Sequence, residues 1–243
     1  MTAEPLPSAP GQPDLAHIRD WVFDLDNTLY PAECDLFAEI DARMTDFVAR
    51  YLGVDAGAAR RLQKRYYAEY GTTLKGLMTL HGMAPQAFLD HVHDIDLSPL
   101  PVDRSLRRAL ERLPGRRFVY TNGSRRHAER VTRQMGLQGV FDGLFGIEEG
   151  AFHPKPDPRS YAAFCAAFDV APEEAIFFED LERNLKPARE MGFATVLVRS
   201  DAQWTAGEPA AARPAGRSHG QSPCADYVTD SLADFLQAVC PDP

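Results

Sequence analysis

The order of apolar and polar positions along the chain predicts strands that alternate with helices. Apolar runs of strand length end in polar residues, and these strands are predicted at 18–24, 117–121, 144–147, 175–178, 195–198 and near Tyr227. Elsewhere apolar residues recur at three- and four-residue steps, the period of a helix. These helices are predicted at 103–113, 124–136, 158–168, 182–191 and 232–239. Such alternation indicates an α/β fold, with a Rossmann-like parallel sheet covered by helices on both faces.

One stretch after the first strand breaks this alternation and shows only helical periodicity. The helices are predicted at 35–51, 58–70, 74–80 and 85–93, with breaks at Gly71 and at 82–85. The sequence therefore predicts an all-helical cap, 32–101, inserted into a core made of 15–31 and 102–243.

Two further segments show no periodicity. Residues 1–14 are rich in Pro, Ala, Ser and Gly and lack the basic start and apolar centre of a signal peptide, so they predict a disordered tail. Residues 202–223, rich in Ala, Gly, Pro, Ser and Arg, predict a mobile loop within the core.

Charge and cysteine content narrow the classes of partner. The net charge of -9 over 243 residues argues against nucleic acid polymers and anionic membranes. A small anionic substrate stays compatible, because a bound cation reverses the local sign of the field. The four cysteines have neither C-x-x-C spacing nor a nearby histidine, which favours reduced thiols in a cytoplasmic protein. The sequence leaves the oligomeric state open.

Polar side chains follow four of the predicted strands at the point where each strand ends. They are Asp24 and Asp26, then Thr121, Asn122 and Gly123, then Lys155, and finally Glu179 and Asp180. In an open parallel sheet, ligands bind beyond the carboxyl ends of the strands. The coincidence at four strand ends predicts that these residues make one site.

Each of these residues also has an ordinary structural explanation. Asp24 and Asp26 can cap a helix or form a turn, Asn122-Gly123 is a common turn pair, and Lys155 can be an exposed loop lysine. Adjacent carboxylates repel each other unless a cation is near, so Glu179-Asp180 favours a metal. The four matched strand ends together favour the site over the separate explanations.

On these residues the chain resembles the haloacid dehalogenase-like (HAD) superfamily of hydrolases over 18–239. The resemblance rests on D-x-D-N-T after an apolar strand, T-N-G, the lysine and E-D, in that order. Within the superfamily the chain resembles the pyrimidine 5′-nucleotidases with a helical cap of the C1 type. That finer resemblance rests on the run 23–31, on Glu69-Tyr70-Gly71, Gly76-Leu77 and His81, and on Asn184.

The resemblance implies a Mg²⁺-dependent phosphomonoesterase. Its metal ligands would be Asp24, Asp180 and the backbone carbonyl of Asp26, with Glu179 supporting the ion through water or as an occasional ligand. Asp24 would attack phosphorus and form a phospho-aspartate. Asp26 would protonate the leaving alcohol and then activate water, while Lys155 would supply positive charge.

The remaining site residues bind substrate or support the others. Thr121, through its hydroxyl, and the amides of Asn122 and Gly123 would hold the phosphate near a helix start. Asn184 would hydrogen-bond Lys155 or an acidic neighbour.

In the cap, Tyr70, Lys75 and His81 are candidates for contacts with the substrate. A core role for the tyrosine and a solvated surface role for the other two remain open. The histidines at 91, 93, 127 and 153 form no metal-binding constellation and are assigned no role.

The function predicted from the resemblance is hydrolysis of UMP and CMP to nucleoside and phosphate, with a small phosphate monoester as the only partner. A phosphatase or phosphomutase for another small metabolite, such as a sugar phosphate or a lysophospholipid, is the alternative. A dehalogenase has no use for Asp26 or magnesium. A HAD-fold scaffold would be expected to lack at least one of Asp24, Asp26, Lys155 and Asp180, and all four are present.

Overall fold

Six parallel strands form a single sheet in the computed structural model, which describes residues 15–201, 213–218, 220 and 222–241. The strands are β1 (Asp20–Phe23), β2 (Arg116–Tyr120), β3 (Gly143–Phe145), β4 (Ala175–Glu179), β5 (Ala194–Val198) and β6 (Tyr227–Thr229). Their order in the sheet is β3-β2-β1-β4-β5-β6. The chain runs outward from β1 to β3 and then returns to β4 on the other side of β1. The predicted fold class is confirmed.

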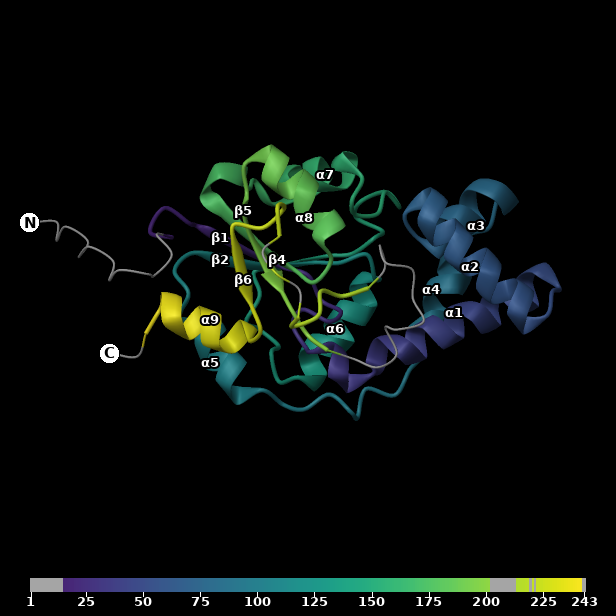
Figure 1. Ribbon diagram of the computed structural model, residues 1–243, viewed down its shortest axis with the longest axis horizontal. Coiled ribbons are helices and arrows are strands. Elements are labelled where there is room, and N and C mark those ends of the chain that lie inside the picture. The colour runs from purple at the N-terminus through teal and green to yellow at the C-terminus, as the bar shows by residue number, and fades with distance from the viewer. Residues whose placement is uncertain (1–14, 202–212, 219, 221, 242–243) are drawn as a thin grey trace, which may run out of the picture.

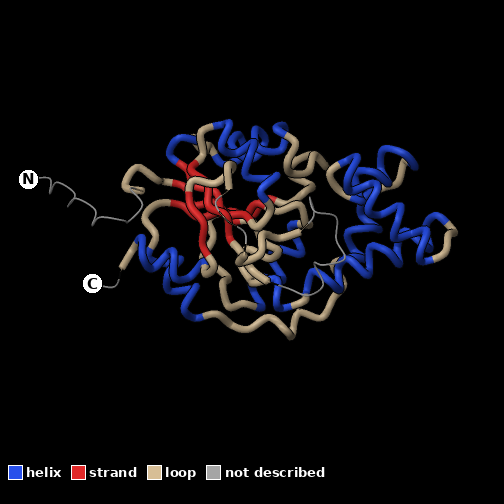
Figure 2. Tube along the Cα trace, viewed as in Figure 1, coloured by secondary structure: helices blue, strands red, loops and turns tan. Residues whose placement is uncertain are grey.

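Helices cover both faces of this sheet (Figures 1 and 2). One face carries α7 (Pro158–Phe168) and α8 (Glu182–Met191), and the other carries α5 (Arg104–Arg112), α6 (Arg125–Gln134) and α9 (Leu232–Val239). Successive strand residues point to opposite faces. Val22 therefore packs into the core on the α7 and α8 side, while Trp21 and Phe23 pack into the core on the other. Full burial of the Val22 and Phe23 side chains contributes about 1.5–3 kcal/mol each.

The ends of the core helices follow from local sequence. The side chains of Asp103, Ser124 and Asp157 accept hydrogen bonds from backbone N–H groups in the first turns of α5, α6 and α7. Such N-caps satisfy donors that have no partner inside the helix. Gly192 ends α8 in the left-handed conformation that glycine adopts without strain. A short 3₁₀ helix, η2 (Pro172–Glu174), leads into β4.

Four more helices lie together beyond one end of the sheet (Figure 1). After the 3₁₀ helix η1 (Ala32–Cys34) come α1 (Leu36–Leu52), α2 (Ala56–Tyr70), α3 (Thr73–His81) and α4 (Pro85–Val92). They share an apolar core of their own, with Tyr66, Leu77 and Phe88 among its members. We propose that α1–α4 are the cap that the sequence predicts, and we use that name for them.

The predicted tail, 1–14, lies outside the described residues, as does most of the predicted loop at 202–223. Within the described part of that loop, Ala215 is buried, and its N–H donates to the carbonyl of Asp180 at 2.9 Å. In the part of the chain that the structure describes, no helix has the length and apolar character needed to cross a membrane.

Candidate active site

The register of the sheet brings the predicted strand ends to one edge. Phe23, the last residue of β1, pairs with Val119 of β2 and with Phe178 of β4. The next residue, Asp24, continues the ladder by donating its N–H to the carbonyl of Phe178 at 2.9 Å. Because β1 is where the strand order reverses, these side chains enter the crevice in which open α/β sheets bind ligands.

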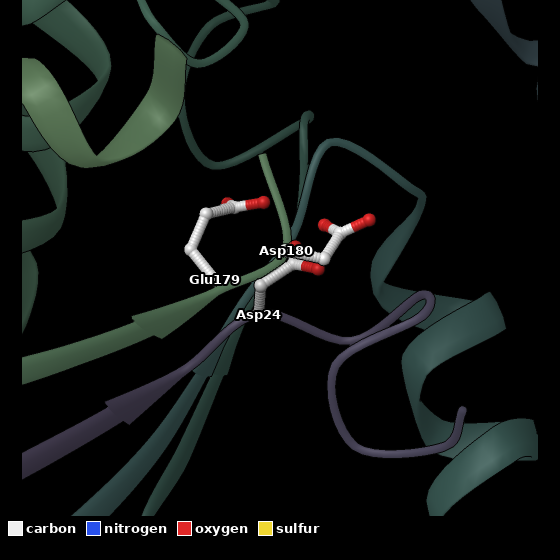
Figure 3. Close-up of side chains that lie close together, drawn as sticks. All are labelled: Asp24, Glu179 and Asp180. Carbon is white, nitrogen blue, oxygen red and sulfur yellow. The ribbon is translucent and has the colours of Figure 1, made fainter. Parts of the chain in front are cut away.

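Three buried carboxylates meet at this edge (Figure 3). Asp24 follows β1, Glu179 ends β4, Asp180 comes next, and one oxygen from each lies within 4.8 Å of the others. Burial and the Glu179 carboxylate raise the pKa of Asp24 to about 8, although Lys155 acts in the opposite direction. Burial and Glu179 also raise the pKa of Asp180 well above its ordinary value. Both aspartates thus lack enough compensating positive charge.

Lys155 is the cation of this cluster. Its Nζ lies 2.6 Å from Asp24 Oδ1 and 2.7 Å from Glu179 Oε2, and it donates to the carbonyl of Tyr120 at 2.9 Å. Only 1% of its surface is exposed. Burial acts to lower its pKa, but Asp24 and Glu179 more than offset this, and the pKa lies above its ordinary value. A charged lysine therefore contacts two of the three carboxylates, Asp24 and Glu179.

The donor set suits a small, hard cation. Mg²⁺ takes oxygen ligands, commonly one or two carboxylates together with water and substrate oxygens. Asp24 and Asp180 offer such carboxylates, and the raised pKa values show that this cluster has room for more positive charge than Lys155 supplies. Glu179 is held by Lys155, which fits a supporting role. The side chain of Asp26 is not part of this cluster.

The Asp26 carboxylate has its own set of partners. Tyr30 donates its hydroxyl to Asp26 Oδ1 at 2.6 Å, and His127 Nε2 lies 3.0 Å from the same oxygen. Burial acts to raise the pKa of Asp26, but the His127 ring and the Tyr30 hydroxyl outweigh it, so the pKa lies below its ordinary value. No role for His127 was predicted from the sequence. A signal that could have found it is its position one turn after the helix start at Ser124.

The T-N-G segment does more than line the site. The side chain of Asn122 accepts from the Lys155 N–H at 2.7 Å and donates to the Lys155 carbonyl at 3.1 Å, so it holds the backbone on which the lysine is carried. The Gly123 N–H, which we expected to face phosphate, donates to Thr121 Oγ1 at 2.9 Å. Phosphate binding by this amide would require it to exchange that partner.

A pocket of about 140 Å³ opens over the carboxylates and continues between the core and the cap. Its lining includes the predicted site residues Asp24, Asp26, Thr121, Asn122, Gly123, Lys155, Glu179, Asp180 and Asn184. Asn184 makes no hydrogen bond through Oδ1 within the described residues, so the bond predicted with Lys155 does not form through that atom.

The cap wall of the pocket differs from the expected one. The described residues that line it do not include Tyr70, Lys75 or His81, and His81 instead lies with Nε2 2.9 Å from the hydroxyl of Tyr66. The wall is mostly apolar, built by Phe37, Ile40, Met44, Leu74, Phe88, Leu89 and Val92.

One polar network interrupts this apolar wall. The buried carboxylate of Asp41 accepts from Gln63 and Lys64, each at 2.5 Å, and pairs with Arg60 at 2.7 Å. These residues were not predicted from the sequence, because helical periodicity does not show which side of a cap helix faces the core.

A comparison with models of known protein families decides the family. The model of the haloacid dehalogenase-like hydrolases matches residues 21–192, which span the site from β1 through α8. The chain belongs to this family. The HAD resemblance drawn from the strand ends is thereby confirmed, whereas the nucleotidase subfamily is not tested by this match.

Curated relatives of the HAD chain include phosphatases. It is 29% identical over 203 residues to phosphate metabolism protein 8 of Saccharomyces cerevisiae, covering 76% of this chain and 62% of that protein. It is 31% identical over 129 residues to enolase-phosphatase E1 of Methylococcus capsulatus, covering 51% of this chain and 52% of the other. The chain thus spans between half and two thirds of the length of these two relatives.

Solved structures support the HAD fold. An L-2-haloacid dehalogenase from Xanthobacter autotrophicus, with chloropropionic acid covalently bound, superposes with a TM-score of 0.56 at 18% identity, covering 93% of this chain and 100% of the other. A HAD phosphatase from Thermococcus onnurineus gives 0.57 at 17% identity, with 91% and 97% covered. At this identity the likeness concerns the fold alone.

Proposed function

We propose that the protein is a Mg²⁺-dependent phosphomonoesterase that carries the phosphoryl group transiently on Asp24. The observation that carries the proposal is the contact of Asp24 Oδ1 with Lys155 Nζ at 2.6 Å, in a pocket that Asp26 also lines. Positive charge from Lys155 and from a bound cation would together keep the Asp24 carboxylate ionised, so that it can act as a nucleophile. A second carboxyl group two residues later can exchange protons with the leaving group and with water.

In the first half of the reaction, an Asp24 oxygen attacks phosphorus and the bond between phosphorus and the ester oxygen breaks. Asp26 donates a proton to the departing oxygen, so an alcohol leaves. Lys155 neutralises negative charge on Asp24 and the phosphoryl oxygens. Since the pKa of Asp26 is lowered, its carboxyl group must take up a proton before this step.

In the second half, Asp26 as carboxylate takes a proton from water. The water oxygen bonds to phosphorus, the bond to Asp24 breaks, and inorganic phosphate leaves. The lowered pKa of Asp26 favours the form needed here. Asp24 and Asp180, with the Asp26 carbonyl, would hold Mg²⁺, which supplies charge that lets an anionic carboxylate approach a phosphate dianion.

One structural neighbour is a haloacid dehalogenase, but two features of this site favour phosphoryl transfer over dehalogenation. Dehalogenation by an aspartate nucleophile needs neither a proton donor at Asp26 nor a cation, whereas this site has Asp26 and an acidic cluster suited to Mg²⁺. The relative named as an enolase-phosphatase adds support. A phosphomutase would use the same groups, and it is distinguished by return of the phosphoryl group to a sugar instead of to water.

The pocket favours a leaving group that has a flat or apolar face and also carries polar atoms able to meet the polar part of the wall. Its cap wall is mostly apolar and offers one polar network, at Asp41, Gln63 and Lys64. A pyrimidine nucleoside fits this description, so UMP and CMP are the proposed substrates, and a cytoplasmic location agrees with them. Sugar phosphates and lysophospholipids are the alternative substrate class.

A phosphate-release screen over nucleotides, sugar phosphates and lysophospholipids, with and without Mg²⁺, tests the function. We expect Mg²⁺-dependent release from UMP and CMP, and its loss on chelation. Release confined to sugar phosphates or lysophospholipids would reject the nucleotidase and keep the phosphatase. Lack of release from every monoester would reject the phosphatase.

A further inference from the structure

A buried histidine lies directly behind the Asp26 carboxyl group. His127, in α6, has no exposed surface, and its Nε2 is 3.0 Å from Asp26 Oδ1, although 101 positions separate the two residues. A histidine in a core commonly serves packing alone. Here Nε2, the ring nitrogen that has a hydrogen-bond partner, points at the Asp26 carboxyl group in the active site.

The surroundings of His127 hold its ring in one orientation. The ring stacks on that of His93, with centroids 4.3 Å apart and planes 13° from parallel. Ser124 Oγ accepts from the backbone N–H of His127 and lies 3.0 Å from His93 Nδ1. His127 Nδ1 has no hydrogen-bond partner among the described residues, so we assign the ring proton to Nε2, which donates to Asp26.

Tyr30 supplies a second hydrogen-bond donor to Asp26 Oδ1. The Tyr30 hydroxyl is 2.6 Å from Asp26 Oδ1, and this tyrosine is 1% exposed. With two donors on Oδ1, the exchangeable proton of the carboxylic acid belongs on Oδ2. No donor contacts Oδ2 within the described residues, and Asp26 lines the pocket, so Oδ2 is the oxygen that can meet a substrate.

We propose that His127, together with Tyr30, is a positioning residue that fixes the Asp26 carboxyl group through Oδ1 and leaves Oδ2 to exchange protons in the pocket. This inference rests on the proposed phosphatase function. In the first half of the reaction, the proton on Oδ2 passes to the departing ester oxygen as its bond to phosphorus breaks. In the second half, Oδ2 takes the proton of the attacking water.

If this positioning is lost, the decrease in the rate of phospho-enzyme formation should depend on the leaving group. A nucleoside alkoxide needs its proton as it departs, whereas p-nitrophenolate is stable enough to leave without one. The test compares UMP with p-nitrophenyl phosphate by rapid-quench measurement of phospho-enzyme formation, so that later hydrolysis does not enter.

Three variants and two controls carry this test. His127→Leu roughly keeps the volume of the side chain and removes its N–H donor. His127→Gln restores an N–H donor at similar reach. Tyr30→Phe removes only the hydroxyl that is the second donor to Asp26. His91→Leu, at a half-buried histidine that pairs with the exposed Asp46, and Tyr66→Phe, whose hydroxyl contacts His81, are matched controls outside the site.

We expect His127→Leu to slow phospho-enzyme formation from UMP by about 10²-fold, at the low end of the range for general acid catalysis. The rate of phospho-enzyme formation from p-nitrophenyl phosphate should change by no more than about threefold. For UMP, the substitution should change KM less than it changes kcat. His127→Gln should recover part of the loss, and Tyr30→Phe should show the same dependence on leaving group. The control variants should behave as wild type.

An equal loss with both substrates, or none with either, would overturn the inference. If His127→Leu does not fold, Tyr30→Phe and His127→Gln decide by the same criterion. If the wild-type protein hydrolyses another monoester in place of UMP, that monoester takes the place of UMP in the comparison. Wild-type protein that forms no phospho-enzyme from any monoester would instead overturn the proposed function, and this inference with it. Wild-type turnover combined with a uniform loss overturns the positioning role alone.

Discussion

Lys155 Nζ lies 2.6 Å from Asp24 Oδ1, and both side chains are buried at the edge of the sheet. The lysine comes from a loop after β3 and the aspartate from the end of β1, so the sheet holds them together. Because Lys155 also contacts Glu179, one ammonium group serves two carboxylates at once. A change at this lysine should therefore affect both stability and chemistry.

Replacing Lys155 with Met should destabilise the protein and abolish turnover. The substitution keeps much of the volume but leaves buried carboxylates without their cation, and breaking a buried ion pair in this way costs about 3–5 kcal/mol. Urea unfolding with excess EDTA measures the loss. As a control, Lys186→Met removes an exposed lysine whose pair with Glu190 is 4.0 Å long, and it should cost less than about 1 kcal/mol. Equal losses for the two variants would contradict the account.

Binding of Mg²⁺ should release protons near pH 7. Without the cation, the pKa of Asp24 is raised to about 8, so below that pH this carboxyl group is mostly protonated. A metal ligand must be deprotonated, and affinity should therefore rise as the pH increases toward 8. Calorimetric titration in buffers of different ionisation enthalpy measures the proton release. Asp180→Asn should weaken Mg²⁺ binding, and an affinity independent of pH between 6 and 8 would contradict this prediction.

His93 should make stability depend on pH below 6.5. Burial, with the neighbouring His127 ring, lowers the pKa of His93 from 6.5 to about 3. Between these values the unfolded chain binds a proton that the folded protein does not, so stability falls as the pH drops from 6.5 toward 3. The slope from this one group approaches about 1.4 kcal/mol per pH unit. Urea unfolding at pH 4.5, 5.5 and 6.5 measures it, and His93→Gln should have a smaller slope than wild type. Identical slopes would show that His93 does not titrate in this way.

Gly76 should be essential to the packing of α2 against α3 in the cap. A Cβ atom built on Gly76 would lie 2.4 Å from Cβ of Tyr66, which cannot move without its helix. Alanine favours a helix over glycine by about 1 kcal/mol, but overpacking costs about 1–3 kcal/mol. We expect Gly76→Ala to lower thermal stability. Gly220→Ala, where nothing lies within 4 Å of the added atom, is the control and should be neutral. A stabilised Gly76→Ala variant would show that α3 shifts freely.

The strand ends were predictable from sequence because polar residues follow four apolar strands, and ligands bind beyond the carboxyl ends of the strands in an open parallel sheet. That pattern located Asp24, Lys155 and Asp180 on one edge, where the structure places them. The partners of Asp26 were not predictable, since the contact of His127 with it joins residues 101 positions apart. The position of His127 one turn after the helix start places it near the strand ends, but it does not identify Asp26 as its partner.

The cap illustrates the same limit of sequence reasoning. Helical periodicity predicted both ends of each of its four helices to within two residues. It did not show which face of α2 turns toward the core, because that depends on how α1 and α2 pack on each other. The pocket is consequently lined by Gln63 and Lys64 instead of Tyr70.

The most direct test of the account is to trap the phosphorylated protein and locate the phosphate. Wild-type protein would be mixed with substrate and Mg²⁺, quenched in acid within milliseconds and digested for mass spectrometry. We predict phosphate on the peptide that contains Asp24, in an acyl linkage labile to hydroxylamine, and none in Asp24→Asn protein that is folded by circular dichroism. Phosphate on another residue, or wild-type turnover by Asp24→Asn, would contradict the central claim.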